Sequence, residues 1–239
     1  GYDPELIRAF NLDSKIPIKD YHIIAGKHNL NGEEVVPLDI ERARKLIVEN
    51  RDRVDAFAVS SFLSVMNPEH EIAVKGLIES LTDLPVVCGH NLTSELNSIK
   101  RAATVALNAR LIPIVEELIL SVEQALAEKR IEAPLAVVKG DGSLMSAKMA
   151  RERPIETVLS GPAASSIGAW FLSGRDDGIM VDMGGTTTDI AVLKGGKPRV
   201  NPKGATVGEW MTAVRPVDMR TCGIGGDSYI RVDKEEVLR

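Results

Sequence analysis

Two carboxylates enclose a run of glycines and threonines late in the chain. Residues 181–190 read VDMGGTTTDI, so that Asp182 and Asp189 flank the pair Gly184-Gly185 and three threonines. Paired glycines allow positive φ and carry no β-carbon, so consecutive backbone N–H groups can converge on an anion, and threonine hydroxyls add donors. A carboxylate beside such a turn would repel phosphate unless a cation lay between them. We therefore predict a phosphate-holding turn with Asp182 at a Mg²⁺ ion or at its coordinated water.

The residues on either side of this turn favour two strands. Apolar residues lead in at 179–181 and lead out at 190–193 with the spacing of strands. A Walker loop would need a lysine and a hydroxyl residue opening a helix, and a dinucleotide fingerprint would need a third glycine on a strand-to-helix turn. Neither is present, so an ordinary glycine hairpin with polar threonines is the alternative that the local pattern leaves open.

Composition limits the classes of function. The 239 residues are enough to bury a sizeable core in one large domain or two smaller ones. A net charge of −5, only 4% aromatic residues and no basic run argue against a nucleic-acid partner. Cys88 and Cys222 lie far apart, which indicates free thiols in a reducing compartment, and we expect a cytoplasmic protein. No apolar run approaches the roughly 18 residues that a membrane helix needs, so we expect no membrane partner.

Strands and helices alternate along the first half of the chain. A hairpin comes first, and the alternation that follows implies parallel βαβ units. In order, we predict strands 21–25 and 34–36, helix 38–50, strand 54–59, helix 68–80, strand 85–88 and helices 94–109 and 113–129. Pro113 suits the first turn of the last helix, because a proline there lacks only an N–H that would have no helical partner.

A change of composition near residues 133–143 marks the domain boundary that we predict. A short strand at 135–138 precedes Asp141, which lies between two glycines and is interpreted as a turn residue or as a group that reaches a substrate or metal. Ser160-Gly161-Pro162 is a helix-start signal. The small residues at 163–169 suit a helix that crosses between lobes, or one that simply packs tightly in a core. A second glycine cluster, TCGIGGDS, covers residues 221–228.

Four spaced segments together resemble the hydantoinase/oxoprolinase family of the hydantoinase A type. They are GDGSLMS at 140–146, SGPAASSIGA at 160–169, VDMGGTTTDIAV at 181–192 and TCGIGGDSYIRVD at 221–233, and SSFLSVMNPEHE at 60–71 is also similar. A small-residue helix followed by a strand and D-x-G-G-T-x-T-D resembles the second phosphate loop of the actin, Hsp70 and sugar-kinase ATPase superfamily. The resemblance implies an α/β protein with the ribonuclease-H-like, actin/Hsp70-type ATPase fold in two lobes, both incomplete in this chain.

The resemblance also implies how the chain is divided. Residues 1–132 would be a partial lobe I, residues 133–175 a crossover region with the small-residue helix, and residues 176–239 the start of lobe II. Family members are longer and carry a first D-x-G-G-T-x-T-D loop at the start of lobe I, whereas this chain has one copy. We therefore expect an internal piece of a longer protein, without its first phosphate loop and without turnover of its own.

Roles for individual positions follow from the resemblance. In the superfamily, ATP lies between the lobes and aspartates hold Mg²⁺ through water. Asp182 then takes the catalytic and metal-holding position, while Asp189 either assists the cation or caps the turn, and we favour the cap. The implied nucleotide-contacting residues are Gly184, Gly185, Thr186, Thr187, Thr188, Gly223, Gly225 and Gly226. For the last three glycines, a tight turn is an equally good explanation.

The family resemblance implies a reaction as well. ATP would drive the opening or activation of a cyclic amide of the hydantoin or 5-oxoproline class, because phosphate transfer to the amide oxygen makes a better electrophile. We expect ATP and Mg²⁺ as cofactors, a small cyclic-amide substrate and a hydantoinase B-type partner subunit or domain. A carboxylase outcome, a sugar-kinase-like phosphotransferase and a nucleotide-gated protein-interaction module are the alternatives. Cys88 and His90 invite a nucleophile–base interpretation, against which we expect a buried thiol and an exposed imidazole.

Overall fold

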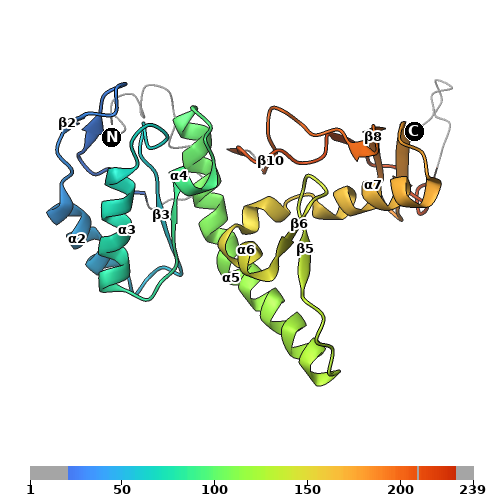
Figure 1. Cartoon of the computed structure of the whole chain (residues 1–239), viewed down its shortest axis with the longest axis horizontal. Helices are drawn as coiled ribbons and strands as arrows, with labels where there is room; N and C mark the ends of the chain where they lie inside the picture. Colours follow the sequence, from blue (N-terminus) through green and yellow to red (C-terminus); the bar gives the residue numbers. More distant parts are fainter. Residues whose placement is uncertain (1–20, 209, 230–239) are drawn as a thin grey trace. The chain divides into compact units, whose positions relative to one another are not determined.

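The computed structural model describes residues 21–208 and 210–229, which form two compact units of mixed α/β structure (Figure 1). Unit 1 comprises the chain up to residue 137 together with 145–158 and 203–214, and unit 2 comprises 138–144, 159–202 and the chain from 215 onward. The units are therefore interleaved along the sequence, and the sequential division at residues 132 and 175 remains a prediction.

Unit 1 begins with a hairpin and continues as alternating strands and helices. The hairpin pairs β1 with β2 in antiparallel register, and β3 pairs with β4 in parallel register. The elements are β1 Lys27–His28, β2 Glu34–Val36, α2 Ile40–Asn50, β3 Phe57–Val59, α3 Glu69–Leu81, β4 Val86–Cys88, α4 Gly89–Leu92, α5 Ser98–Glu128, β5 Ala136–Val138, β6 Leu144–Ser146, α6 Ala147–Glu152, η2 Pro154–Thr157, β10 Thr206–Val207 and β11 Trp210–Met211. The parallel βαβ unit predicted from the alternation is thus confirmed in β3, α3 and β4.

Helices cover both faces of the β3–β4 pair, with α2 and α3 on one side and α5 on the other (Figure 1). Alternate strand residues reach the two cores: Phe57 and Val86 pack into the core built by α2 and α3. Val87 instead packs with Val105 and Ala109 of α5. Burial on both faces is typical of parallel strands and explains their apolar sequences.

Two element predictions in unit 1 are wrong. The first strand lies at 27–28 instead of 21–25, because Asn29 and Gly32 close the turn directly after it, with Gly32 at φ 81°. Residues 94–109 and 113–129 do not form two helices, since α5 runs unbroken from Ser98 to Glu128 with Pro113 inside it. None of the helices in the described part of the chain, α5 included, is long and apolar enough to cross a bilayer.

Unit 2 is an antiparallel sheet covered by one helix. The sheet order is β12–β8–β7, with β9 paired to β8. Its elements are α7 Ser160–Ser173, β7 Gly178–Met183, β8 Thr188–Lys194, β9 Lys197–Pro198 and β12 Met219–Cys222. The predicted hairpin around the glycine turn is therefore confirmed. Outside these strands, Val217 forms an isolated antiparallel bridge with Val200.

The small residues of α7 let it pack closely on this sheet. Ala163 and Ser166 are fully buried, and Ala163 shares a core with Met180 of β7 and Ala191 of β8. The helix starts at Ser160 as predicted, but Leu159 precedes it in a left-handed conformation with φ 62° and no side chain caps the first turn. The tight-packing interpretation of the small residues thus accounts for the buried face of α7.

Candidate functional site

The glycine turn joins β7 and β8 in a register that sets the two aspartates opposite one another. Asp182 pairs with Asp189, and Met183 pairs with Thr188. The backbone N–H of Gly184 donates to the carbonyl of Thr187 over 2.9 Å and closes the turn. Directly opposed residues of an antiparallel pair share one face of the sheet, with β-carbons about 4.5–5.5 Å apart. The register therefore brings together the two carboxylates that the sequence suggested as metal-holding groups.

The second glycine cluster docks against this turn. Gly226 N–H donates to the carbonyl of Gly184 over 2.9 Å, and Asp227 N–H donates to the carbonyl of Gly185 over 2.8 Å. Below them, the buried Thr188 donates its hydroxyl to the carbonyl of Ile224 over 2.6 Å. The sheet order explains the encounter, because β12 lies beside β8 and delivers residues 223–228 to the turn between β7 and β8.

Gly185 and Gly225 are the two glycines that this close approach requires. A β-carbon on Gly225 would collide with the carbonyl oxygen of Gly185. A β-carbon on Gly185 would lie 2.7 Å from a carboxylate oxygen of Asp227. Among the described glycines with left-handed φ, none belongs to either loop, so the positive φ that glycine allows is not used at these positions. Gly223 differs from its neighbours, since a β-carbon there would meet nothing within 4 Å.

Three consecutive N–H groups of the turn remain available to a ligand. Within the described part of the chain, no acceptor takes the backbone N–H of Gly185, Thr186 or Thr187. The side chains of both threonines are exposed. Thr188 differs, because its hydroxyl proton is already used to hold the second loop. The arrangement can bind an oxyanion through backbone N–H groups and two hydroxyls, which is the chemistry of a phosphate site.

The carboxylates at this site have different partners. Asp189 accepts a hydrogen bond of 2.6 Å from the hydroxyl of Thr221 on β12, so the expectation that it caps the turn is wrong. Asp182 is exposed, and no hydrogen bond or ion pair reaches it from any described residue. Like charges directly opposite each other destabilise a sheet, and hard oxygen ligands suit Mg²⁺. The opposed pair therefore fits a bound divalent cation.

A third carboxylate was missed at the level of sequence. The Asp227 carboxylate lies against the Gly185 backbone, where it adds negative charge beside the turn. The only sequence signal is that an acidic residue follows the second glycine cluster. Asp141 is not part of this arrangement, since it accepts hydrogen bonds from the N–H and hydroxyl of Ser143. Burial alone would raise the pKa of Asp141, but these bonds and Lys139 outweigh it and hold the pKa below its ordinary value. The turn interpretation of Asp141 is confirmed.

Unit 1 holds a separate cluster around Cys88 and His90. Cys88 is buried with a free thiol, as expected, and burial followed by the charge of Glu71 raises its pKa to about 12. His90 is not exposed as expected: its side chain is only 18% accessible, and its Nδ1 lies 2.6 Å from Oε2 of Glu71. Ligand atoms of Glu71, Cys88 and His90 lie within 4.8 Å of one another. However, both Glu71 oxygens already accept N–H groups and the thiol keeps its proton, so the cluster is hydrogen-bonded and not arranged around a metal.

Comparison with known proteins accounts for nearly the whole chain. The model of the hydantoinase/oxoprolinase family matches residues 101–239, and the model of the hydantoinase/oxoprolinase N-terminal region matches residues 2–82. The chain is 30% identical over 221 residues to the caprolactamase subunit alpha of Pseudomonas jessenii, covering 90% of the chain and 32% of the relative. It is 26% identical over 232 residues to the acetophenone carboxylase gamma subunit of Aromatoleum aromaticum, covering 92% of the chain and 31% of the relative.

Solved structures give the same result for the fold. The ATP-dependent caprolactamase from Pseudomonas jessenii superposes with a TM-score of 0.78 at 28% identity, covering 98% of the chain and 34% of that protein. The nucleotide-free structure of acetone carboxylase, an enzyme of ATP-dependent acetone carboxylation, superposes with a TM-score of 0.69 at 20% identity. This match covers 98% of the chain and 37% of that protein. The chain thus spans about a third of the length of the relatives that it matches.

Proposed function

Since the chain belongs to the hydantoinase/oxoprolinase family, we propose that the protein containing it is an ATP-dependent enzyme that activates or opens a cyclic amide of the hydantoin or 5-oxoproline class. The observation that carries the proposal is the pair of docked glycine loops in unit 2, where three free N–H groups lie beside two opposed carboxylates. We further propose that the fold is of the actin/Hsp70 ATPase type and that unit 2 supplies one of its phosphate-binding hairpins.

In this proposal the residues of the turn bind and orient the phosphates of ATP. The N–H groups of Gly185, Thr186 and Thr187 donate to phosphate oxygens, and the hydroxyls of Thr186 and Thr187 add two donors. Fixed dipoles of this kind stabilise the charge that develops during phosphoryl transfer without reorganising. Gly225 and Gly226 hold the turn in shape through the second loop. Gly223 and Thr188 complete the proposed nucleotide-binding set. Thr188 contributes by holding the second loop against the turn through its hydrogen bond to Ile224.

Asp182 and Asp189 would hold Mg²⁺, directly or through water. When bound, the cation would neutralise phosphate charge and polarise the transferred group. Without the cation, Asp182 would repel the phosphates of ATP, which is why we assign it the role most sensitive to substitution. We expect Asp182→Asn in the whole protein to lower ATP hydrolysis by about 100-fold or more, comparable with the loss of one strong electrostatic contact. Unchanged ATPase activity in a folded Asp182→Asn protein would refute this role.

Transfer of an oxygen label tests the reaction class. A cyclic amide carrying ¹⁸O on its carbonyl is incubated with the whole protein, ATP and Mg²⁺. If the carbonyl oxygen is phosphorylated, the label appears in inorganic phosphate once the ring has opened. Hydantoin, 5-oxoproline and caprolactam are compared as ring substrates, with the Asp182→Asn protein as the matched control. Ring opening without label in phosphate would contradict the proposal.

A carboxylating outcome is the second candidate, because the chain resembles a subunit of acetophenone carboxylase over 92% of its length. Bicarbonate-dependent ATP hydrolysis with a ketone, but not with a cyclic amide, would favour it. The two curated relatives are named as subunits of enzymes, and we propose that this protein likewise acts with a hydantoinase B-type subunit or domain. A nucleotide-gated interaction module would instead hydrolyse ATP only when a partner protein is added.

A further inference from the structure

Two buried ionisable residues from neighbouring helices lie at the carboxyl ends of the parallel strands of unit 1. Glu71 of α3 and Arg101 of α5 are both fully buried. Ser61 follows β3 and Gly89 follows β4, so the loops that meet these two side chains leave the same edge of the sheet. Ligands of open α/β sheets bind outside this edge. Burying a charge costs free energy, and apolar side chains can often replace buried charges without loss of stability. Stability alone therefore does not explain why Glu71 and Arg101 are buried here.

Glu71 holds His90 at two points, its backbone N–H and its ring. Its Oε2 accepts the backbone N–H of His90 over 2.9 Å and lies 2.6 Å from the ring Nδ1. Its Oε1 accepts the N–H of Ser61 over 2.7 Å, which ties the two strand ends together. A carboxylate that accepts from Nδ1–H holds the imidazole in the tautomer whose Nε2 is the acceptor. No described residue makes a hydrogen bond to that nitrogen.

Other charged groups around His90 hold the backbone in place. Arg101 donates to the carbonyls of Ser61 and Phe62 after β3, each over 2.7 Å. Arg153 donates to the carbonyl of Asn91, next to His90. Burial keeps the thiol of Cys88 protonated, so the charge that contacts the ring directly is the carboxylate of Glu71. A β-carbon on Gly89 would lie 3.0 Å from Oε1 of Glu71, which shows how closely the loop after β4 wraps the carboxylate.

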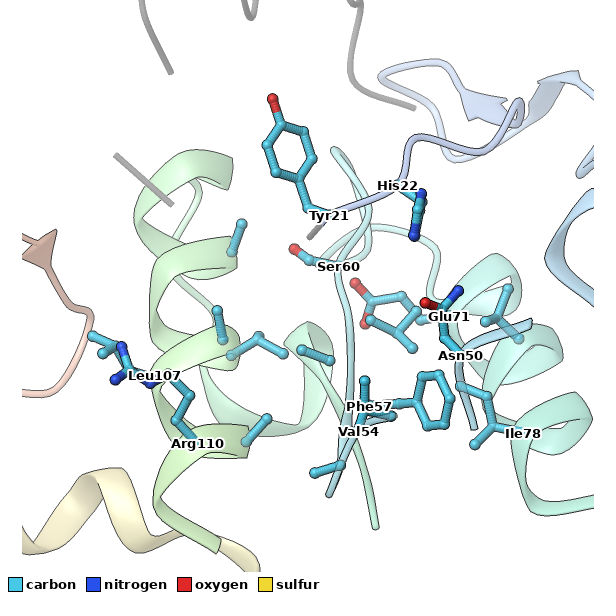
Figure 2. Close-up of a pocket in the computed structure, with 18 of the residues that line it drawn as sticks. Tyr21, His22, Asn50, Val54, Phe57, Ser60, Glu71, Ile78, Leu107 and Arg110 are labelled. Atoms are coloured by element: carbon cyan, nitrogen blue, oxygen red, sulfur yellow. The ribbon is translucent and has the colours of Figure 1, made fainter. Parts of the chain in front are cut away.

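A cavity of about 970 Å³ in unit 1 includes Glu71 in its lining (Figure 2). Glu71 and Ser60 line it together with apolar residues such as Phe57 and Ile78. His90 is not among the lining residues. Glu71 therefore lines the cavity and also holds the imidazole of His90, whose side chain keeps 18% of its surface accessible.

We propose that His90 is an acid–base residue of a substrate site at the carboxyl ends of β3 and β4, and that Glu71 is its positioning residue. This inference rests on the proposed function, in which the substrate is a neutral amide. In the step assigned to His90, the N–H bond of the amide breaks, its electron pair stays in the N–C–O group, and the proton forms a bond with Nε2. The amide oxygen becomes a stronger nucleophile, and the carboxylate of Glu71 stabilises the imidazolium.

Substitution of His90 with chemical rescue tests this assignment in the whole enzyme. We expect His90→Ala to lower kcat by about 100-fold or more, within the usual range for loss of an acid–base group. Added imidazole should restore part of the rate, and the fall in rate at low pH should disappear from the variant without imidazole. Asn91→Ala, which changes the exposed neighbour, is the matched control and should keep the wild-type rate.

Glu71→Gln provides the test of positioning. This substitution removes the negative charge of Glu71 but keeps a hydrogen-bond acceptor, so kcat should fall while the low-pH limb of the rate profile persists. Circular dichroism confirms that each variant is folded. An active His90→Ala enzyme with an unchanged pH profile would overturn the inference, as would stoichiometric zinc lost in both His90→Ala and Cys88→Ser. The proposed function is judged separately, by the wild-type reaction and by Asp182→Asn.

Discussion

Single residues at the docked glycine loops decide whether the phosphate turn keeps its shape. Gly225 has no room for a side chain, because its α-carbon faces the carbonyl of Gly185, whereas Gly223 is open. We expect Gly225→Ala to separate the loops, to lower the free energy of unfolding by about 1–3 kcal/mol as overpacking does, and to reduce ATP hydrolysis by the whole protein at least tenfold. Gly223→Ala is the control and should change neither quantity. Equal activity of the two variants would contradict this account of the loops.

Sequence alone identified most residues of this site but not how they are held. The glycines, threonines and aspartates of 181–190 could be named because alternating strands and a glycine pair are local signals. The docking of Gly225 on Gly185 could not, since it depends on β12 pairing with β8 across more than thirty residues. The Glu71–His90 contact was missed for the same reason, because most of α3 and the whole of β4 separate the two residues.

At the scale of elements, the β1–β2 hairpin is joined to α3 by two histidines. The ring of His28 packs against that of His70 at a tilt of 38°, with centroids 4.0 Å apart. Nε2 of His70 lies 2.7 Å from a carboxylate oxygen of Glu34. Burial, and then the neighbouring His70, lower the pKa of His28 from its ordinary 6.5, although Glu34 and Glu69 act in the opposite direction. The neutral ring is therefore the form that the folded hairpin accepts.

This contact predicts a pH dependence of stability. Between pH 6.5 and the lower folded pKa of His28, the unfolded chain binds the proton more readily, so stability is complete above about pH 6.5 and is lost as the pH falls through that folded pKa. The slope is at most about 1.4 kcal/mol per pH unit, since one proton is taken up. Urea unfolding at pH 5, 6 and 7 should show a flatter dependence for His28→Gln than for the wild type. Identical slopes would mean that His28 does not carry the effect.

Helix α5 shows why the division at Pro113 failed. Proline costs about 3 kcal/mol in a helix interior, which favours two helices on local grounds. Tertiary packing outweighs this cost, because Ala109 and Ile112 are buried before the proline and Ile119 is buried after it. The parts of α5 before and after the proline thus pack into different cores of unit 1.

The same packing predicts that Pro113 can be replaced with a gain in stability. The side chain of Pro113 is exposed, so Pro113→Ala leaves no cavity and restores a helical hydrogen bond. We expect the free energy of unfolding to rise by about 1–3 kcal/mol, measured by chemical denaturation. Pro162→Ala is the matched control, since proline in the first turn of α7 lacks no helical bond and should give no gain. A loss of stability in Pro113→Ala would show that the helix requires the proline.

At the scale of the whole molecule, phosphate binding needs donors from more than one loop. The chain carries one D-x-G-G-T-x-T-D segment, and its turn offers three N–H groups and two hydroxyls beside three carboxylates. In the two-lobed ATPase fold that we propose, a second hairpin would share the binding of the phosphates. One hairpin alone provides only part of the electrostatic preorganisation on which phosphoryl transfer depends.

We therefore expect the isolated 239-residue chain to bind MgATP weakly and to hydrolyse none. Calorimetric titration of the chain with MgATP should give little heat, whereas the whole protein under the same conditions should bind with a measurable affinity. Asp182→Asn in the isolated chain is the control. The substitution removes a carboxylate that repels phosphate, so the affinity for metal-free ATP should not fall. It also removes a proposed Mg²⁺ ligand, so the affinity for MgATP should fall. Micromolar binding of MgATP by the isolated chain would contradict the prediction, because a single hairpin would then suffice to hold the nucleotide.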